Sequence, residues 1–189
     1  MGTVDTSQFR NGLKLEIDGQ PNTITYFQHV KPGKGGAFVR TKLKNLLNGK
    51  VVERTFRSGE KLEEADIEEK SMQYLYHDGQ ELIFMDAQSY DQIPIGGDVL
   101  GNAVNYLLEN MEVEVLFWRG KPVNIGLPNY VEAKVKKSDP GLKGDTSSGA
   151  TKPATIESGA TLQVPLFIEE GDVIRVDTRT GEYSERVSK

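Results

Sequence analysis

One lysine stands at the tip of a glycine-rich turn, and its setting is the strongest chemical signal in this sequence. Lys34 lies within residues 31–36, between two runs of residues, 24–30 and 37–47. The β-branched and alternating residues of these runs are typical of strands. The segment that carries Lys34 is therefore predicted to be the tip of a β-hairpin.

The neighbours of this lysine make the tip thin and leave one long side chain on it. A proline restricts its own φ, and glycines permit positive φ and leave the backbone bare. A solvated turn is the ordinary explanation of a Gly-Lys-Gly segment. This tip, however, has more glycines than a short hairpin needs. We expect four residues to support the lysine: Pro32, Gly33, Gly35 and Gly36.

The chemistry open to this lysine is narrow. A Schiff-base or general-base lysine is buried, whereas a tip flanked by glycines is wet. A phosphate-binding P-loop places Ser or Thr after its Gly-Lys at the start of a helix, but here Gly35 leads into a strand. What remains is an ammonium group on a slender arm. Such an arm can enter a site formed by another molecule, and an enzyme that modifies the lysine can also grip it.

Composition excludes several other kinds of site. The 189 residues contain no cysteine and two histidines, so thiol chemistry and a histidine or cysteine metal cluster are not expected. Neither paired carboxylates in apolar surroundings nor a Ser-His-Asp order can be assembled from the predicted strands. No apolar run has the length of a membrane span, and residues 1–5 do not resemble a signal peptide. We expect a soluble cytoplasmic protein that is not an enzyme.

Charge divides the chain into thirds. Residues 1–63 have a net charge of +5, residues 64–128 a net charge of −9 and residues 129–189 a net charge of −1. A basic first third suggests contact with a phosphate backbone, and an acidic middle third suits solvent or a protein. The basic face is predicted to contain Lys31, Arg40, Lys42 and Arg54.

The same thirds are the predicted domains. About five short strands within residues 1–63 indicate an SH3-like barrel, and residues 64–128 and 129–189 each suggest an OB-fold. Residues 62–69 are interpreted as a linker or as the entry to the next domain, and residues 138–153 as a long exposed loop.

Local patterns add finer expectations. A short helix is predicted over residues 99–110, and type I′ turns are predicted at two dipeptides, Asn48-Gly49 and Asp78-Gly79. Three aromatic residues are assigned to the core: Tyr106, Trp118 and Tyr130.

Several motifs in one order resemble a known family. Residues 29–40 resemble the lysine-tipped loop of bacterial elongation factor P, which is related to the hypusine-bearing factor of archaea and eukaryotes. The resemblance continues over nearly the whole chain. It is strongest again at residues 139–146, 151–154, 164–168 and 170–172.

The resemblance implies an all-β protein, with an N-terminal SH3-like (KOW-type) barrel, two OB-fold barrels and an elongated tRNA-like shape. It implies binding to the 70S ribosome between the peptidyl-tRNA and exit sites. There Lys34 would contact the CCA end of peptidyl-tRNA and promote bond formation at consecutive prolines. A lysine-modifying enzyme is a further implied partner. Pro32 together with Lys34 argues against the rhamnosyl-arginine subgroup.

The resemblance also implies that a loop of the third domain lies near messenger RNA at the exit-site codon. This loop contains Gly144, Asp145 and Thr146, which can hydrogen-bond base edges. An Asx-type turn explains the same residues without a function. We expect a monomer without cofactor, metal or membrane partner.

Two other functions stay open at this point. A general RNA-binding β-barrel protein would use the basic residues, but it has no use for a single protruding lysine. A small enzyme using Lys34 would turn over a small molecule without ribosomes.

Overall fold

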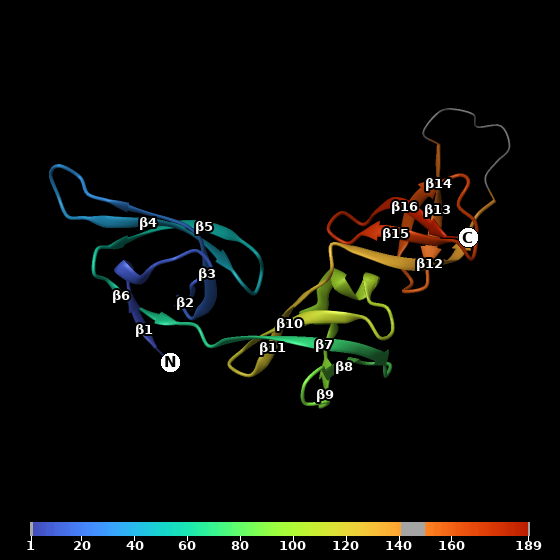
Figure 1. Cartoon of the computed structure of the whole chain (residues 1–189), viewed down its shortest axis with the longest axis horizontal. Coiled ribbons are helices and arrows are strands. Elements are labelled where there is room, and N and C mark those ends of the chain that lie inside the picture. The colour runs from blue at the N-terminus through green and yellow to red at the C-terminus, as the bar shows by residue number, and fades with distance from the viewer. Residues whose placement is uncertain (1, 141–149, 189) are drawn as a thin grey trace. The chain divides into compact units, whose positions relative to one another are not determined.

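The computed structural model describes residues 2–140 and 150–188 and shows three β-sheets linked along the chain (Figure 1). Two compact units are formed, one by residues 1–69 with 115–124 and the other by residues 70–114 with 125–189. The prediction of a mostly β protein is confirmed. The three sheets follow one another in sequence, as three small β-modules require.

The first sheet has six strands in the order β1-β6-β2-β3-β4-β5. A 3₁₀ turn, η1 (Thr6–Gln8), follows β1. The strands are β1 (Thr3–Asp5), β2 (Lys14–Ile17), β3 (Gln20–Val30), β4 (Phe38–Asn45), β5 (Val51–Arg57) and β6 (Lys61–Glu64).

Alternation explains why this sheet has one core face. In β4 every second side chain, from Val39 to Leu43, is buried, and the residues between them are exposed. Two aromatic rings, Phe9 and Phe56, meet edge to face at 5.7 Å inside the same cluster. The first domain therefore has its own hydrophobic core.

Of the two interpretations of residues 62–69, the linker is wrong, whereas the entry to the next domain agrees with the start of β7 (Ile67–His77) within this segment. Leu62 lies opposite Val4 in an antiparallel pair between β6 and β1. Its half-buried side chain packs against the first core. The segment closes the first sheet, and after a two-residue break Ile67 begins the next strand.

The middle sheet has the order β11-β10-β7-β8-β9. Its strands are β7 (Ile67–His77), β8 (Leu82–Asp86), β9 (Gln92–Ile95), β10 (Glu112–Trp118) and β11 (Lys121–Gly126). The predicted helix is present but shorter: α1 (Gly97–Leu100) passes into a 3₁₀ helix, η2 (Gly101–Tyr106).

The type of each turn is shown by the sign of φ at its two central residues, and an Asn-Gly or Asp-Gly dipeptide alone does not decide it. Asp18 and Gly19 both have positive φ, 53° and 73°, as a type I′ turn requires. At the two predicted type I′ turns only Gly49 and Gly79 have positive φ, so these two expectations are wrong. The side chain of Asn45 instead accepts backbone N–H groups at the first of them.

The third sheet has the order β14-β13-β12-β15-β16. Its strands are β12 (Tyr130–Ser138), β13 (Thr151–Ile156), β14 (Thr161–Pro165), β15 (Val173–Asp177) and β16 (Glu182–Ser188). The predicted loop over residues 138–153 is therefore too long at both ends, because Ser138 and Thr151 are in strands.

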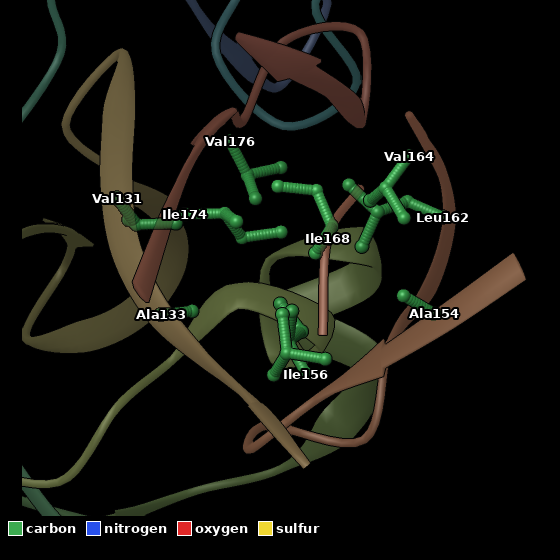
Figure 2. Close-up of a cluster of buried hydrophobic side chains, with 10 residues drawn as sticks. Val131, Ala133, Ala154, Ile156, Leu162, Val164, Ile168, Ile174 and Val176 are labelled. Atoms are coloured by element: carbon green, nitrogen blue, oxygen red, sulfur yellow. The ribbon is translucent and has the colours of Figure 1, made fainter. Parts of the chain in front are cut away.

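A single strand joins the two halves of the third domain. The first part of β12 pairs with β15, and after an irregularity at Val135 its last part pairs with β13. This shared strand curls the sheet around a core to which both halves contribute. Figure 2 shows the inward-pointing side chains, among them Ile156, Ile168 and Ile174, which have no exposed surface.

Candidate functional site

The loop that carries Lys34 extends beyond the paired part of a hairpin. The last cross-strand pair joins Val30 of β3 to Phe38 of β4, so residues 31–37 lie outside the ladder. In Figure 1 this hairpin reaches outward from its sheet, with the turn at its far end. Ser58 donates a 3.0 Å backbone hydrogen bond to the carbonyl oxygen of Ala37 and so holds the base of the loop.

The tip around Lys34 is open on all sides. Residues 31–36 are all exposed. No hydrogen bond or ion pair joins Lys34 to another residue that the structure describes. The geometry presents one ammonium group on a bare turn, as the sequence predicts.

The three glycines have different roles. Only Gly35 has a positive φ, at 110°, a conformation that side chains with a Cβ rarely adopt. Gly33 and Gly36 have no heavy atom near the position of a Cβ, so space does not require glycine there. Gly35 therefore sets the direction of the turn, while the other two keep it thin.

The base of the hairpin is packed where it joins the barrel. Phe27 and His29 contact each other edge to face at 5.8 Å, and Val39, opposite His29, has no exposed surface. Farther down, a bulge at Thr25 inserts one extra residue into β3 opposite β4, and the Thr25 hydroxyl donates to the carbonyl oxygen of Lys42. The arm is therefore anchored on a packed sheet.

The cations predicted as one basic face occupy two faces. Arg40 and Lys42 lie on the outer side of β4, where Lys42 pairs with Glu53 at 3.7 Å. Arg54 lies opposite Thr41, whose side chain is buried, and so belongs to the inner side. The grouping of Arg54 with the other three residues is wrong, because neighbours along a strand alternate sides. Lys31 lies on the loop itself and is exposed.

A lysine in the third domain, Lys152, is buried, which the sequence prediction did not include. Lys152 has 8% of its surface exposed, and its amine donates a 2.8 Å hydrogen bond to the carbonyl oxygen of Asp139. The signal was present in the alternation of Lys152 with Ala154 and Ile156, which share its face of β13. The predicted messenger-side residues, Gly144, Asp145 and Thr146, lie outside the described residues.

Comparisons with known proteins cover nearly all of this chain. Three family models match in order: the elongation factor P KOW-like domain at residues 5–62, the elongation factor P OB domain at residues 67–125 and the elongation factor P C-terminal domain at residues 131–186. Elongation factor P of Moorella thermoacetica is 54% identical over 183 residues, 97% of this chain and 99% of the relative. That of Nocardia farcinica is also 54% identical, over 97% of this chain and 98% of the relative.

The chain belongs to the elongation factor P family. It is a translation elongation factor, with a KOW-like domain followed by OB-type domains. Among solved structures, eukaryotic translation initiation factor 5A from Methanococcus jannaschii is similar, with a TM-score of 0.51 and 25% identity over 66% of this chain and 95% of that one. A related family protein from Naegleria fowleri, at 17% identity and a TM-score of 0.51, supports the fold alone.

The carboxyl groups with shifted pKa values in this chain stabilise its turns. The side chain of Arg179 donates to Asp177 at 2.6 and 2.9 Å and, with backbone N–H groups, lowers the Asp177 pKa to about 2. Backbone N–H groups of Gln88 and Ser89 likewise lower the pKa of Asp86. These groups stabilise local structure, which is the common alternative to catalysis for a shifted pKa.

Two further observations concern the predicted absences and the aromatic residues. Within residues 2–140 and 150–188 no cluster of three or more His, Cys, Asp or Glu is placed to hold a metal ion, and no helix is long and apolar enough to cross a membrane.

Tyr130, assigned to the core from the sequence, is 46% exposed, with the guanidinium of Arg179 5.6 Å from its ring centre. That assignment is wrong for Tyr130.

Proposed function

We propose that this protein binds the ribosome between the peptidyl-tRNA and exit sites and promotes peptide bond formation at consecutive prolines. Lys34 contacts the CCA end of peptidyl-tRNA and favours its reactive geometry. The ribosome performs the chemistry. The observation that carries this proposal is the position of Lys34, exposed and without a partner among the described residues at the end of a hairpin.

The physical argument rests on positioning. Proline is a poor acceptor and makes a poorly oriented nascent chain, so the reacting groups spend little time in a productive arrangement. Holding reactants in place can lower a barrier substantially, because the entropy of orientation is lost before the reaction. An arm anchored on a packed sheet, with one cation near the phosphates and hydroxyls of a CCA end, supplies that ordering without any group of its own reacting.

The same exposure suits a modifying enzyme. A glycine-flanked lysine on a thin loop fits a narrow active site, and an added group would lengthen the arm. We propose that Lys34 is the modified residue. An intact-mass measurement of the protein from its native host tests this directly: a mass above that of the sequence, lost in Lys34→Arg, is the expected result.

Two secondary contacts complete the proposal. Exposed cations on the outer side of β4, together with Lys31, contact the phosphate backbone of tRNA or ribosomal RNA. Gly144, Asp145 and Thr146 contact messenger RNA at the exit-site codon, as the family resemblance implies. A protein that acts on translating ribosomes would work in the cytoplasm.

The test is reconstituted translation of a Pro-Pro-Pro template. Lys34→Ala removes no buried surface, so it should melt like the parent protein, yet it should lose about tenfold or more of the stimulation because orientation is lost. Lys34→Arg is the matched control for charge, and it should retain more activity than alanine when the unmodified protein is used.

Other functions give different results. A general RNA-binding protein would bind RNA equally well with and without Lys34 and would not distinguish proline templates from others. Full stimulation by Lys34→Ala would contradict the proposed role of the arm.

A further inference from the structure

A solvent-open cavity of about 300 Å³ lies at one end of the first barrel. It is lined by ten residues from two parts of the chain, 17–22 and 43–54. It adjoins the β2–β3 turn and the ends of β4 and β5. Along the β3–β4 ladder it lies at the pair Asn22–Asn45, whereas the loop with Lys34 follows the opposite end, at Val30–Phe38. The proposed CCA contact therefore does not use this cavity.

The floor of the cavity is apolar and is only partly covered. Leu43 and Ile17 belong to the buried core, with 0% and 8% of their surfaces exposed. Val52, opposite Leu43 on β5, leaves 43% of its surface exposed. A flat apolar group placed here would cover Val52, and the removal of this apolar surface from water would favour binding.

Side-chain amides form one wall, and their hydrogen bonds hold them in place. Asn45 accepts the N–H groups of Leu47 and Asn48 and donates to Oε1 of Gln20 at 2.6 Å. Asn22, 6% exposed, donates from Nδ2 to the carbonyl oxygen of Gln20 at 2.9 Å. The wall is therefore preorganised before any ligand arrives.

Two polar atoms of this wall are available to hydrogen-bond a ligand. Within the described part of the chain, neither Oδ1 of Asn22 nor Nε2 of Gln20 has a hydrogen-bond partner. One is an acceptor and the other a donor, carried two residues apart on β3. A ligand with a donor and an acceptor side by side on one edge would satisfy both.

Cations stand at the rim. Lys50 is exposed and lines the cavity, and Arg54 lies beside it, joined to Asp18 at 2.7 Å. The ion pair engages the guanidinium, which leaves Lys50 as the cation available to an anionic group. This arrangement favours a ligand that is flat and polar-edged at one end and negatively charged at the other.

We propose that this cavity binds an unpaired nucleobase of RNA, with the base over Val52, its edge on Asn22 and Gln20, and its phosphate beside Lys50. Every nucleobase has a π-face and an edge with adjacent donors and acceptors. In a duplex that edge is already paired, so an unpaired nucleotide is required. This site is separate from the proposed contact of Lys34, and the chain would therefore bind RNA at a second place.

The test is a titration followed by NMR of the full-length protein, with the side-chain NH₂ signals of Gln20, Asn22 and Asn45 as reporters. Adenosine 5′-monophosphate at millimolar concentration should shift these signals, and ribose 5-phosphate should not. A single-stranded tetranucleotide should bind at least tenfold more tightly than the mononucleotide. A blunt-ended RNA duplex, in which every base is paired, should bind more weakly than the strand.

Matched variants separate the contacts. Gln20→Met keeps the length of an exposed side chain but removes its donor, and it should weaken nucleotide binding about tenfold. Lys50→Met should weaken binding and flatten its salt dependence. Gln163→Met, an exposed change on β14, should leave binding unchanged.

Three results would overturn the proposal. Equal shifts with ribose 5-phosphate would mean that the cations bind phosphate alone. Tighter binding of the mononucleotide than of the strand would mean a site for a free nucleotide. Unchanged binding in Gln20→Met would show that Gln20 does not contact the base edge. Each result is independent of the proline-stalling assay, so this site and the role of Lys34 can fail separately.

Discussion

Thr41 and Arg54 lie directly opposite each other on β4 and β5, and the Thr41 hydroxyl donates a 2.7 Å hydrogen bond to the Arg54 carbonyl oxygen. Because Thr41 has no exposed surface, this pair belongs to the core side of the sheet. Arg40 and Lys42, the neighbours of Thr41, are on the other side. The sheet thus places Arg40 and Lys42 on its outer side and Arg54 beside the amide-lined cavity.

The outer cations should contribute to the salt dependence of ribosome or tRNA binding. Replacing Arg40, Lys42 and Lys44 together by Gln should weaken binding and lower the slope of log K against log salt by about 2 to 3, because fewer counterions are released. Lys121→Gln is the control, since it removes an exposed cation from β11, away from both proposed RNA contacts. A slope unchanged in the triple variant would mean that these charges only face solvent.

The direction of the lysine arm should depend on Gly35. Gly35→Ala forces a Cβ onto a φ of 110° and should cost about 1–3 kcal/mol locally, so the turn changes its conformation. We expect reduced stimulation of Pro-Pro-Pro synthesis with little change in melting temperature, because residues 31–37 lie outside the ladder. Gly36→Ala, at a position without positive φ and with open space, should be much milder. Equal losses in both variants would show that thinness, not direction, is what matters.

Residue alternation predicts most of the strands. The pattern of Val39, Thr41 and Leu43 is local, so β4 and its buried face follow from the sequence alone. The same pattern with three glycines also predicts an exposed Lys34. These features depend only on neighbouring residues, which is why they can be derived without a structure.

Strand register and long-range strand pairing cannot be predicted from the local residue pattern. The strand at Leu62 exists because Val4, at the other end of the domain, supplies its partner. The side of the sheet on which Arg54 lies depends on which residue of β4 it faces, and the bulge at Thr25 shifts the faces of β3. At Asn48-Gly49 the dipeptide favours one turn, but the side chain of Asn45 stabilises another.

The core of the third domain should be sensitive to the loss of a single side chain. Ile156 has no exposed surface and lies among the side chains of Figure 2, so Ile156→Ala should lower the free energy of unfolding by about 2–5 kcal/mol. Chemical unfolding of the full chain measures this. Val187→Ala, at an exposed position on β16, should change it by no more than about 0.5 kcal/mol. Similar effects at both positions would contradict the placement of the core.

The ion pair of Asp177 and Arg179 should make the third domain less stable in acid. The Asp177 pKa is lowered from 3.8 to about 2 in the folded chain, chiefly by the side chain of Arg179. A carboxyl group whose pKa is lower when folded stabilises the native state above its unfolded pKa. That stabilisation is lost as pH falls through the folded pKa. The relevant window is therefore from about pH 4 down to about pH 2.

Asp177→Asn tests this linkage because the amide keeps the shape and loses the charge. The variant should unfold more easily than the parent protein at pH 5, and the difference should shrink as the pH approaches 2, where the parent carboxyl becomes protonated. Urea unfolding followed by NMR signals of β15 and β16 gives the comparison within one domain. Glu169→Gln serves as the control, because no hydrogen bond or ion pair joins its exposed carboxylate to a residue in the described part of the chain. A difference between Asp177→Asn and the parent that stays constant from pH 5 to pH 2 would show that the side-chain contact stabilises the turn without any contribution from its charge.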